Sequence, residues 1–133
     1  MSGLFLRTSA PIVVTDPATA ETIKYASNAF LATKVSFVNA IAALCEAVGA
    51  DVSQVVLGMG YDPRIGAGFL RPGPGWGGSC SPKDTVALVR IADDAGYDLG
   101  LLKGVIAVND EQQPVVAKAV RLADGSVQDK IVA

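Results

Sequence analysis

The chain has 133 residues, half of them hydrophobic, and a formal net charge of −2. These values are typical of one folded domain with a core and argue against disorder. The basic residues are scattered and form no stripe that would suit nucleic acid, and no apolar run approaches the roughly 20 residues of a membrane span. Histidine is absent, which excludes Cys–His and Ser–His dyads and imidazole ligands for zinc, and we expect no metal site.

A short β-type run, Ile12-Val13-Val14, precedes a predicted long helix. Asp16 suits the N-cap, Pro17 the first helical position, and Gly49 the stop after Val48. Apolar residues recur between these ends with helical spacing. One stripe consists of Ile23, Ala26, Phe30, Phe37, Ile41, Leu44 and Val48, and a second of Leu31, Val35, Val38 and Ala42. The helix would be roughly 45 Å long, longer than a small domain is wide, so we expect a second subunit to cover part of it in a homodimer.

Shorter helices are predicted beyond this one, which makes the fold class all-α. Asp51, with Gln54 three residues on, suits a capping box for a helix that reaches about Gly58. A last helix is expected over residues 99–123, where Pro114 is a potential kink because proline lacks the N–H of a helical hydrogen bond.

Cys80 lies between a loop rich in glycine and proline, residues 61–78, and another predicted helix. Ser81 suits the N-cap of that helix, with Pro82 at its first position and Asp84 completing a capping box. A thiol just outside a helix N-terminus feels the positive end of the helix dipole, which favours the thiolate. Cys80 is therefore a candidate nucleophile. The alternative is a small hydrophobic core residue, which is the commoner role of an intracellular cysteine.

The second cysteine, Cys45, lies in an apolar helical register and is expected to be inert packing. Cysteines in such different settings do not suggest a disulfide, and no signal peptide is visible, so a reducing, cytoplasmic compartment is expected. Gly73, Gly75 and Gly78 formally satisfy the dinucleotide-binding pattern G-x-G-x-x-G. The strand that must precede that pattern is missing, so we interpret the match as false.

Lys24 and Asn28 are four residues apart and lie on one helix face. Their spacing alone favours a solvated face, whereas the flanking alanine and aromatic residues favour a half-buried lysine that stabilises an oxyanion or acts as a base. Arg64 and Arg71 flank the glycine-rich loop and would suit a phosphate or carboxylate ligand, although exposed loop arginines are common.

Two stretches carry a resemblance to a known family: AETIKYASNAFLA, residues 20–32, and FLRPGPGWGGSCSPKD, residues 69–84. They closely resemble the UDP-glucose dehydrogenase family, which includes GDP-mannose dehydrogenases. The matched part is that family's central dimerisation domain, similar to the C-terminal-like helical fold of 6-phosphogluconate dehydrogenase. The resemblance implies one domain over residues 1–133, without the N-terminal NAD-binding Rossmann domain and the C-terminal UDP-binding domain. Lys130-Ile131-Val132-Ala133 would begin the first strand of the latter.

The resemblance also implies a role for individual residues in oxidising the C6 alcohol of UDP-glucose to a carboxylate with NAD. Cys80 would attack the C6 aldehyde to give a thiohemiacetal, which is then oxidised to a thioester and hydrolysed. Lys24 and Asn28 match residues that stabilise the oxyanions, and Asp84 matches one that transfers protons with water or Lys24. Lys83 and Cys80 would lie near NAD. The residues matched to substrate binding are Arg64 (across the dimer), Phe69, Leu70, Arg71, Pro72, Gly73, Pro74, Gly75, Trp76 and Gly77.

Three interpretations follow from the sequence. The first is the central domain of an NAD-dependent UDP-glucose 6-dehydrogenase, inactive when isolated. The second is a purely structural dimerisation module whose site residues do nothing in isolation. The third is a related enzyme that oxidises GDP-mannose or a UDP-N-acetylhexosamine. Only the Gly-Pro-Gly-Trp loop favours UDP-glucose over these two substrates.

Overall fold

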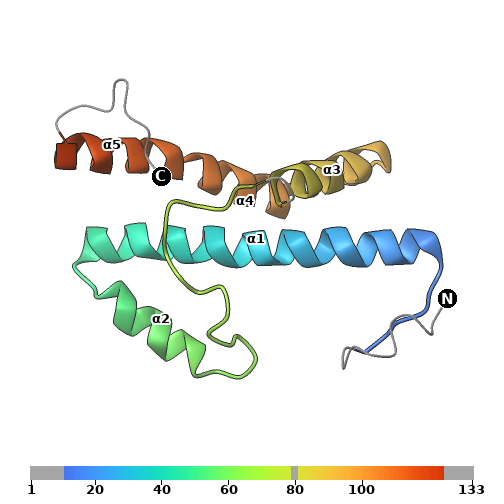
Figure 1. Cartoon of the computed structure of the whole chain (residues 1–133), viewed down its shortest axis with the longest axis horizontal. Helices are drawn as coiled ribbons and strands as arrows, with labels where there is room; N and C mark the ends of the chain where they lie inside the picture. Colours follow the sequence, from blue (N-terminus) through green and yellow to red (C-terminus); the bar gives the residue numbers. More distant parts are fainter. Residues whose placement is uncertain (1–10, 79–80, 125–133) are drawn as a thin grey trace.

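The computed structural model describes residues 11–78 and 81–124 of the chain. Within these ranges the regular structure is entirely helical, which confirms the predicted all-α class. A long helix lies along the middle of the molecule, with α3, α4 and α5 on one side of it and α2 on the other (Figure 1). The helices are α1 (Pro17–Val48), α2 (Val52–Gly60), α3 (Ser81–Asp94), α4 (Gly100–Asp110) and α5 (Gln112–Asp124).

The ends of α1 are set by the residues that the sequence suggested. Asp16 Oδ1 accepts a hydrogen bond of 2.9 Å from the backbone N–H of Thr19, and Oδ2 accepts one of 2.6 Å from the Thr19 hydroxyl. Pro17 occupies the first turn, where its missing N–H has no partner to lose. At the other end Gly49 adopts a φ of 73°, a left-handed conformation that glycine enters without a steric penalty, and its N–H bonds to the Cys45 carbonyl.

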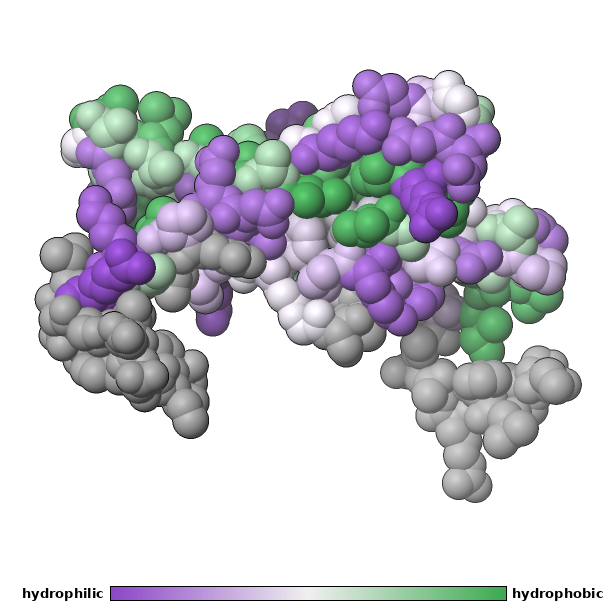
Figure 2. Space-filling model, turned by 90° about the horizontal axis from the view of Figure 1, so that it is seen from above, coloured by the Kyte–Doolittle hydropathy of each residue, from purple (hydrophilic) through white to green (hydrophobic). Residues whose placement is uncertain are grey.

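The core lies between α1 and α4. Ala29 and Ala32 of α1 are buried together with Leu102 and Val105 of α4, and small alanines let the two helices approach closely. Four partly buried side chains complete this cluster: Trp76, Leu88, Val89 and Leu99. Seen from the side of α3, α4 and α5, the surface shows hydrophilic and apolar side chains interspersed (Figure 2).

One face of α1 stays exposed. Ile23, Phe30, Phe37 and Leu44 follow one another at intervals of seven residues and are between 47 % and 64 % exposed. We call these four residues the heptad stripe. In the second stripe predicted from the sequence, Val38 is fully buried, and Leu31, Val35 and Ala42 are half-buried. The two apolar faces of α1 therefore differ, because the chain's own helices cover only one of them.

By length and composition α1 would be able to cross a membrane, since its mean hydropathy reaches 1.5 over part of its 32 residues. The expectation that no segment reaches this level was therefore wrong. Its packing nevertheless suits the central helix of a bundle, because α1 contacts α2, α3 and α4 and its buried Ser36 and Asn39 make hydrogen bonds to other segments.

The β-type run and the last helix were predicted wrongly. Residues 12–14 form no strand in the part of the chain that the structure describes, and their side chains are exposed. A strand needs a neighbouring strand for its hydrogen bonds, and the described elements beside this run are helices. The single helix expected over residues 99–123 is broken at Glu111 into α4 and α5. In a continuous helix the ring of Pro114 would clash with the carbonyl of Asp110, four residues earlier, and α4 ends at that residue.

Helix ends elsewhere differ by one to a few residues from expectation. The predicted cap of α2 is confirmed, since Asp51 Oδ1 accepts from the N–H groups of Ser53 at 2.8 Å and Gln54 at 3.4 Å. Helix α3 begins at Ser81 itself rather than after it. The carboxylate of Asp84, expected in a capping box, bonds instead to α1. Residues 130–133, predicted to start a strand, lie outside the described ranges.

Candidate functional site

The first turn of α3 meets α1 at a buried carboxylate. Asp84 has only 3 % of its side chain exposed, and its Oδ2 accepts a hydrogen bond of 2.8 Å from Asn28 Nδ2. Lys24 Nζ lies 3.6 Å from the same oxygen, one helical turn before Asn28. Lys83 Nζ lies 4.0 Å from the other oxygen, Oδ1. A buried carboxylate therefore holds an amide donor and attracts two ammonium groups at the positive end of a helix dipole.

The two lysines differ from the carboxylate in exposure. The side chain of Lys24 is 58 % exposed and that of Lys83 is 66 % exposed. Spacing alone favoured a solvated position for Lys24, and the ammonium group does reach solvent while it remains within ion-pair distance of Asp84. It also lies 5.2 Å from the centre of the Tyr25 ring. The exposed ammonium of Lys24 and the amide of Asn28 thus both lie within 3.6 Å of one buried carboxylate oxygen.

Three of the four predicted catalytic residues, Lys24, Asn28 and Asp84, are brought together in this way. The fourth, Cys80, lies outside the described residues, and in the sequence it directly precedes Ser81, the first residue of α3. An ammonium and an amide N–H are groups that stabilise a negatively charged oxygen, and a carboxylate beside them can orient them or take a proton. The catalytic roles of these residues stay predictions. Cys45, by contrast, is a free thiol buried inside α1's packing, as expected for an inert residue.

The loop before Cys80 approaches α1 through a backbone kink at Phe69. Phe69 has a φ of 63°, in the left-handed region that disfavours residues other than glycine. The kink turns Leu70 inward, where its side chain is 2 % exposed, while Phe69 itself remains 56 % exposed. Any contact of Leu70 with a substrate would therefore use its backbone, whereas Phe69 presents its ring.

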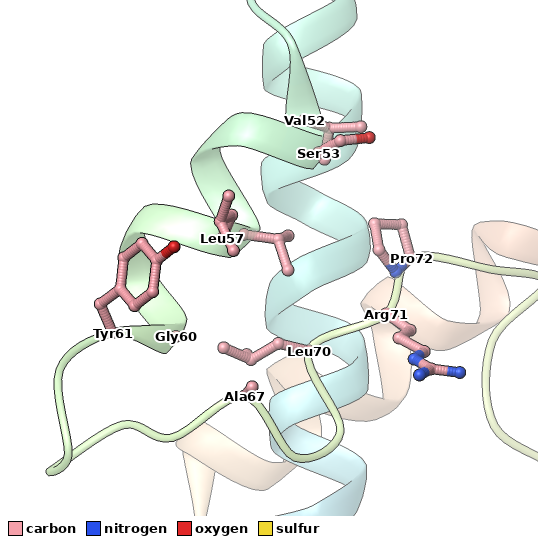
Figure 3. A pocket seen from close by; sticks show the side chains of 10 residues that line it. Val52, Ser53, Leu57, Gly60, Tyr61, Ala67, Leu70, Arg71 and Pro72 are labelled. Atoms are coloured by element: carbon pink, nitrogen blue, oxygen red, sulfur yellow. The ribbon is translucent and has the colours of Figure 1, made fainter.

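A cavity of about 570 Å³ lies between α2 and this loop (Figure 3). Leu57 and Leu70 point into it from opposite walls, and Tyr61 lies at one edge. The guanidinium of Arg71 points away from α2. Arg71 therefore lines the cavity while its guanidinium is directed away from α2.

Arg64 already has a partner in its own loop. Its guanidinium donates to both carboxylate oxygens of Asp62, at 3.0 Å from Nε to Oδ1 and 2.6 Å from Nη2 to Oδ2. These bonds lower the pKa of Asp62 and raise the pKa of Arg64. Arg64 also lines a cavity of about 340 Å³ beside Phe30 and Phe37 of the heptad stripe. It thus lies at the exposed face of α1, apart from the Asp84 cluster.

Sequence reasoning missed several residues that shape the site. Asp62 orients Arg64, and Lys34 Nζ donates to the Ile65 carbonyl at 3.0 Å, which ties the loop to α1. Ser36, Asn39 and Asn109 bond to the glycine-rich loop. The signal for Ser36 and Asn39 was present in the sequence, since they are polar residues within an otherwise apolar stretch of α1.

Comparison with known proteins identifies the family of the chain. The model of the UDP-glucose/GDP-mannose dehydrogenase family, central domain, matches residues 18–111, and the chain belongs to this family. It is 53% identical over 133 residues to UDP-glucose 6-dehydrogenase YwqF of Bacillus subtilis (strain 168), covering 100% of this chain and 30% of that protein. It is 51% identical over 122 residues to UDP-glucose 6-dehydrogenase of Rhizobium meliloti (strain 1021), covering 92% and 28%.

A solved structure shows the same fold. A UDP-glucose dehydrogenase from the hyperthermophilic archaeon Pyrobaculum islandicum superposes with a TM-score of 0.85 at 36% sequence identity, covering 93% of this chain and 29% of that one. The chain thus spans about 30% of the length of the relatives it matches. The family resemblance seen in the sequence is confirmed.

Proposed function

We propose that this chain supplies the thiol part of the active site of an NAD-dependent UDP-glucose 6-dehydrogenase. The observation that carries the proposal is the cluster of Lys24, Asn28 and Asp84 at the first turn of α3, which follows Cys80 directly in the sequence. The names of the relatives support oxidation of a UDP-sugar, and UDP-glucose in particular. The family description also names GDP-mannose, which makes GDP-mannose the alternative substrate.

In the proposed mechanism the C6 alcohol of the sugar first loses a hydride from C6 and the proton of its hydroxyl, which gives the C6 aldehyde. The Cys80 thiolate attacks this aldehyde, and a C–S bond forms as the carbonyl becomes an oxyanion. Lys24 and Asn28 donate hydrogen bonds to that oxygen, whose protonation gives the thiohemiacetal. Loss of a hydride from C6 and a proton from the hydroxyl gives the thioester. Water then attacks the thioester, and the C–S bond breaks to release the carboxylate and the thiol. Asp84 holds both donors in place and accepts a proton from the attacking water or from Lys24.

NAD, when bound, accepts the hydride in each of the two oxidations. The described residues 11–78 and 81–124 contain no strand–glycine turn–helix unit of the kind that binds a dinucleotide. Lys83, which is exposed in the first turn of α3, would contact only the edge of the cofactor. We therefore place most of the NAD site, and the UDP site, on separate N-terminal and C-terminal domains in the remainder of the enzyme. The length of the relatives supports this placement, because the chain covers only 30% of one of them. A cytoplasmic location for the enzyme is part of the same proposal.

The second part of the proposal is a homodimer built on α1. The heptad stripe has the spacing of helices that pair along their length, and its four side chains are about half exposed or more. A two-fold pair would bring the same stripe of each copy together. Arg64 lies beside Phe30 and Phe37 on this face, so it would contact the substrate of the partner subunit.

A chimeric enzyme tests the proposal. This chain replaces the matching segment of the Bacillus subtilis relative, and turnover with UDP-glucose and NAD is measured. Lys24→Ala should lower kcat by about a hundredfold with little change in KM, because an oxyanion donor acts in the transition state. Lys118→Ala, an exposed lysine on α5, is the matched control. A kcat within a few-fold of the parent chimera would contradict the role of Lys24, and a chimera active only with GDP-mannose would favour the alternative.

A further inference from the structure

The glycine-rich loop that precedes Cys80 has few regular backbone partners. Between residues 71 and 78 it forms neither helix nor strand, yet backbone N–H and C=O groups near a core need hydrogen-bond partners. Asn39 Oδ1 accepts from the Gly73 N–H at 2.8 Å. Asn109 Oδ1 accepts from the Trp76 N–H at 2.7 Å, and Asn109 Nδ2 donates to the Trp76 carbonyl at 3.1 Å. Side chains of α1 and α4 thus replace the backbone ladder that this loop lacks.

The indole ring of Trp76 supplies a third attachment. Its Nε1–H donates to Ser36 Oγ at 2.8 Å, and that hydroxyl donates in turn to the Val105 carbonyl at 2.8 Å. Ser36 is 2 % exposed, so both bonds form away from water. The hydroxyl has one proton to donate, and it is already given to α4, so Ser36 accepts from Trp76 in a defined direction. One hydroxyl therefore joins α1, α4 and the loop.

The fit around Asn109 is tight. A Cβ atom added at Gly75 would lie 2.6 Å from Asn109 Oδ1, and the φ of 102° at this position is one that other residues rarely adopt. The Asn109 amide therefore occupies the space that a side chain at position 75 would need. The Asn109 amide thus bonds to both the N–H and the C=O of Trp76 and leaves no room for a side chain at position 75.

We propose that Ser36, Asn39 and Asn109 are positioning residues that hold the loop of residues 73–76 in the shape that receives the nucleotide sugar. This inference rests on the proposed function of that loop. All three residues bond to the loop, and Ser36 also bonds to α4, whereas Asp84 has separate partners, Lys24 and Asn28. They act on substrate binding through the loop and leave the proton and oxyanion chemistry to the other cluster.

The chain contains one tryptophan, so Trp76 reports on the loop without added label. In the 133-residue chain, Asn109→Ala and Ser36→Ala should shift the Trp76 emission to the red and raise its quenching by acrylamide about twofold or more, because the indole loses an attachment. Ser27→Ala is the matched control, since Ser27 is an exposed serine of α1 whose hydroxyl bonds only within the helix. Circular dichroism of each variant checks that the helices remain.

If Asn109→Ala and Ser36→Ala are both folded and Trp76 is quenched as in the parent, these residues do not hold the indole, and the proposal is overturned. If Asn109→Ala loses its helical circular-dichroism signal, Asn109→Asp is measured in its place. The aspartate keeps the oxygen that accepts from the Trp76 N–H and loses only the N–H that donates to the Trp76 carbonyl. Quenching between that of the parent and that of Ser36→Ala is then expected. Quenching equal to the parent in Asn109→Asp, with Ser36→Ala also unchanged, would overturn the proposal.

The chimeric enzyme tests whether the three residues act on substrate binding. Asn109→Ala should raise KM for UDP-glucose about tenfold and change kcat by less than about threefold, the pattern of lost positioning of a binding loop. A KM within twofold of the parent would overturn the role in binding, and so would a loss of kcat alone, which is the pattern expected of Lys24→Ala. An inactive parent chimera would refute the proposed function, whereas the fluorescence of the 133-residue chain would still decide whether the loop is held by these residues.

Discussion

Asn28 Nδ2 donates a 2.8 Å hydrogen bond to Asp84 Oδ2, although the two residues are 56 positions apart. This bond joins the middle of α1 to the first turn of α3. A buried carboxylate without partners is strongly destabilising, so the bond ties the stability of the helix pair to the same residues that form the candidate site. The site and the α1–α3 packing therefore depend on each other.

Removing the amide should consequently destabilise the domain. Among the described residues, Asn28→Ala leaves the Asp84 carboxylate, 3 % exposed, with the ammonium groups of Lys24 and Lys83 as its remaining polar partners. We expect a loss of about 1.5–3 kcal/mol in the free energy of unfolding, the usual range for a hydrogen bond to a charged group. Urea denaturation followed by circular dichroism measures it. Ser27→Ala, at the neighbouring exposed position, should change the value by less than about 0.5 kcal/mol, and equal losses in the two variants would contradict the prediction.

The cap of α1 should make stability depend on pH. Hydrogen bonds from the Thr19 hydroxyl and N–H lower the pKa of Asp16 below its usual 3.8. A carboxyl group whose pKa is lower in the folded state stabilises that state above the unfolded pKa, and the contribution is lost as pH falls through the folded pKa. The stability difference between the parent and Asp16→Asn should therefore be constant above about pH 5 and shrink as pH falls from about 5 to below 3.8. A difference that is constant over this interval would contradict the assignment, and Thr19→Val should reduce the pH dependence.

The two cysteines should react at different rates. Cys45 is 5 % exposed within α1, so a reagent reaches it only when the domain opens. Cys80 precedes a helix N-terminus in the sequence, a position that favours the reactive thiolate. Iodoacetamide at neutral pH should therefore modify Cys80 first, as shown by peptide mass analysis after short exposure. The two rates should converge in urea, and equal rates in the folded chain would remove the reason to regard Cys80 as a poised nucleophile.

The heptad stripe should hold two copies of the chain together. Phe37 is 50 % exposed at its centre, and a carboxylate there would be desolvated in a paired interface. Sedimentation should show a dimer for the parent at micromolar concentration and a monomer for Phe37→Glu. Val86→Glu is the control, because Val86 is similarly exposed, at 56 %, but lies on α3. A monomeric parent would refute the interface, and dissociation by both variants would show that the stripe is not specific.

Two neighbouring glycines should differ in their tolerance of a side chain. At Gly75 a Cβ would meet Asn109 Oδ1 at 2.6 Å with the backbone at a φ of 102°, whereas at Gly77 it would meet nothing within 4 Å. Gly75→Ala should therefore lower the free energy of unfolding by about 1–3 kcal/mol, while Gly77→Ala should stay within about 0.5 kcal/mol of the parent. Combining Gly75→Ala with Asn109→Ala should recover part of the loss, since the contact is removed and only the backbone strain remains. Equal effects at the two glycines would contradict the close contact.

Much of the local structure could be predicted because it depends on neighbours in the sequence. Asp16, Pro17 and Gly49 define a helix whose ends lie where they were expected, since a cap bonds to N–H or C=O groups only a few residues away. The break between α4 and α5 follows from the same local chemistry, because the ring of Pro114 acts on Asp110 one turn earlier. The prediction of one continuous helix there gave the apolar spacing too much weight against the proline.

The residues of the candidate site could be selected from the sequence by resemblance, but their neighbours could not. Hydrophobic spacing shows that α1 has two apolar faces, yet only the packing of the other helices on α1 decides that Val38 is buried and Phe37 is exposed. The sequence predicted that the Asp84 carboxylate caps its own helix, but it accepts a hydrogen bond from Asn28 of α1. A bond between helices compensates the loss of hydration of a buried carboxylate as well as a local cap would. The sequence by itself determined the helices and the chemical types at the site. The tertiary structure alone decided which donors meet which acceptors, since those pairs come from segments that only packing brings together.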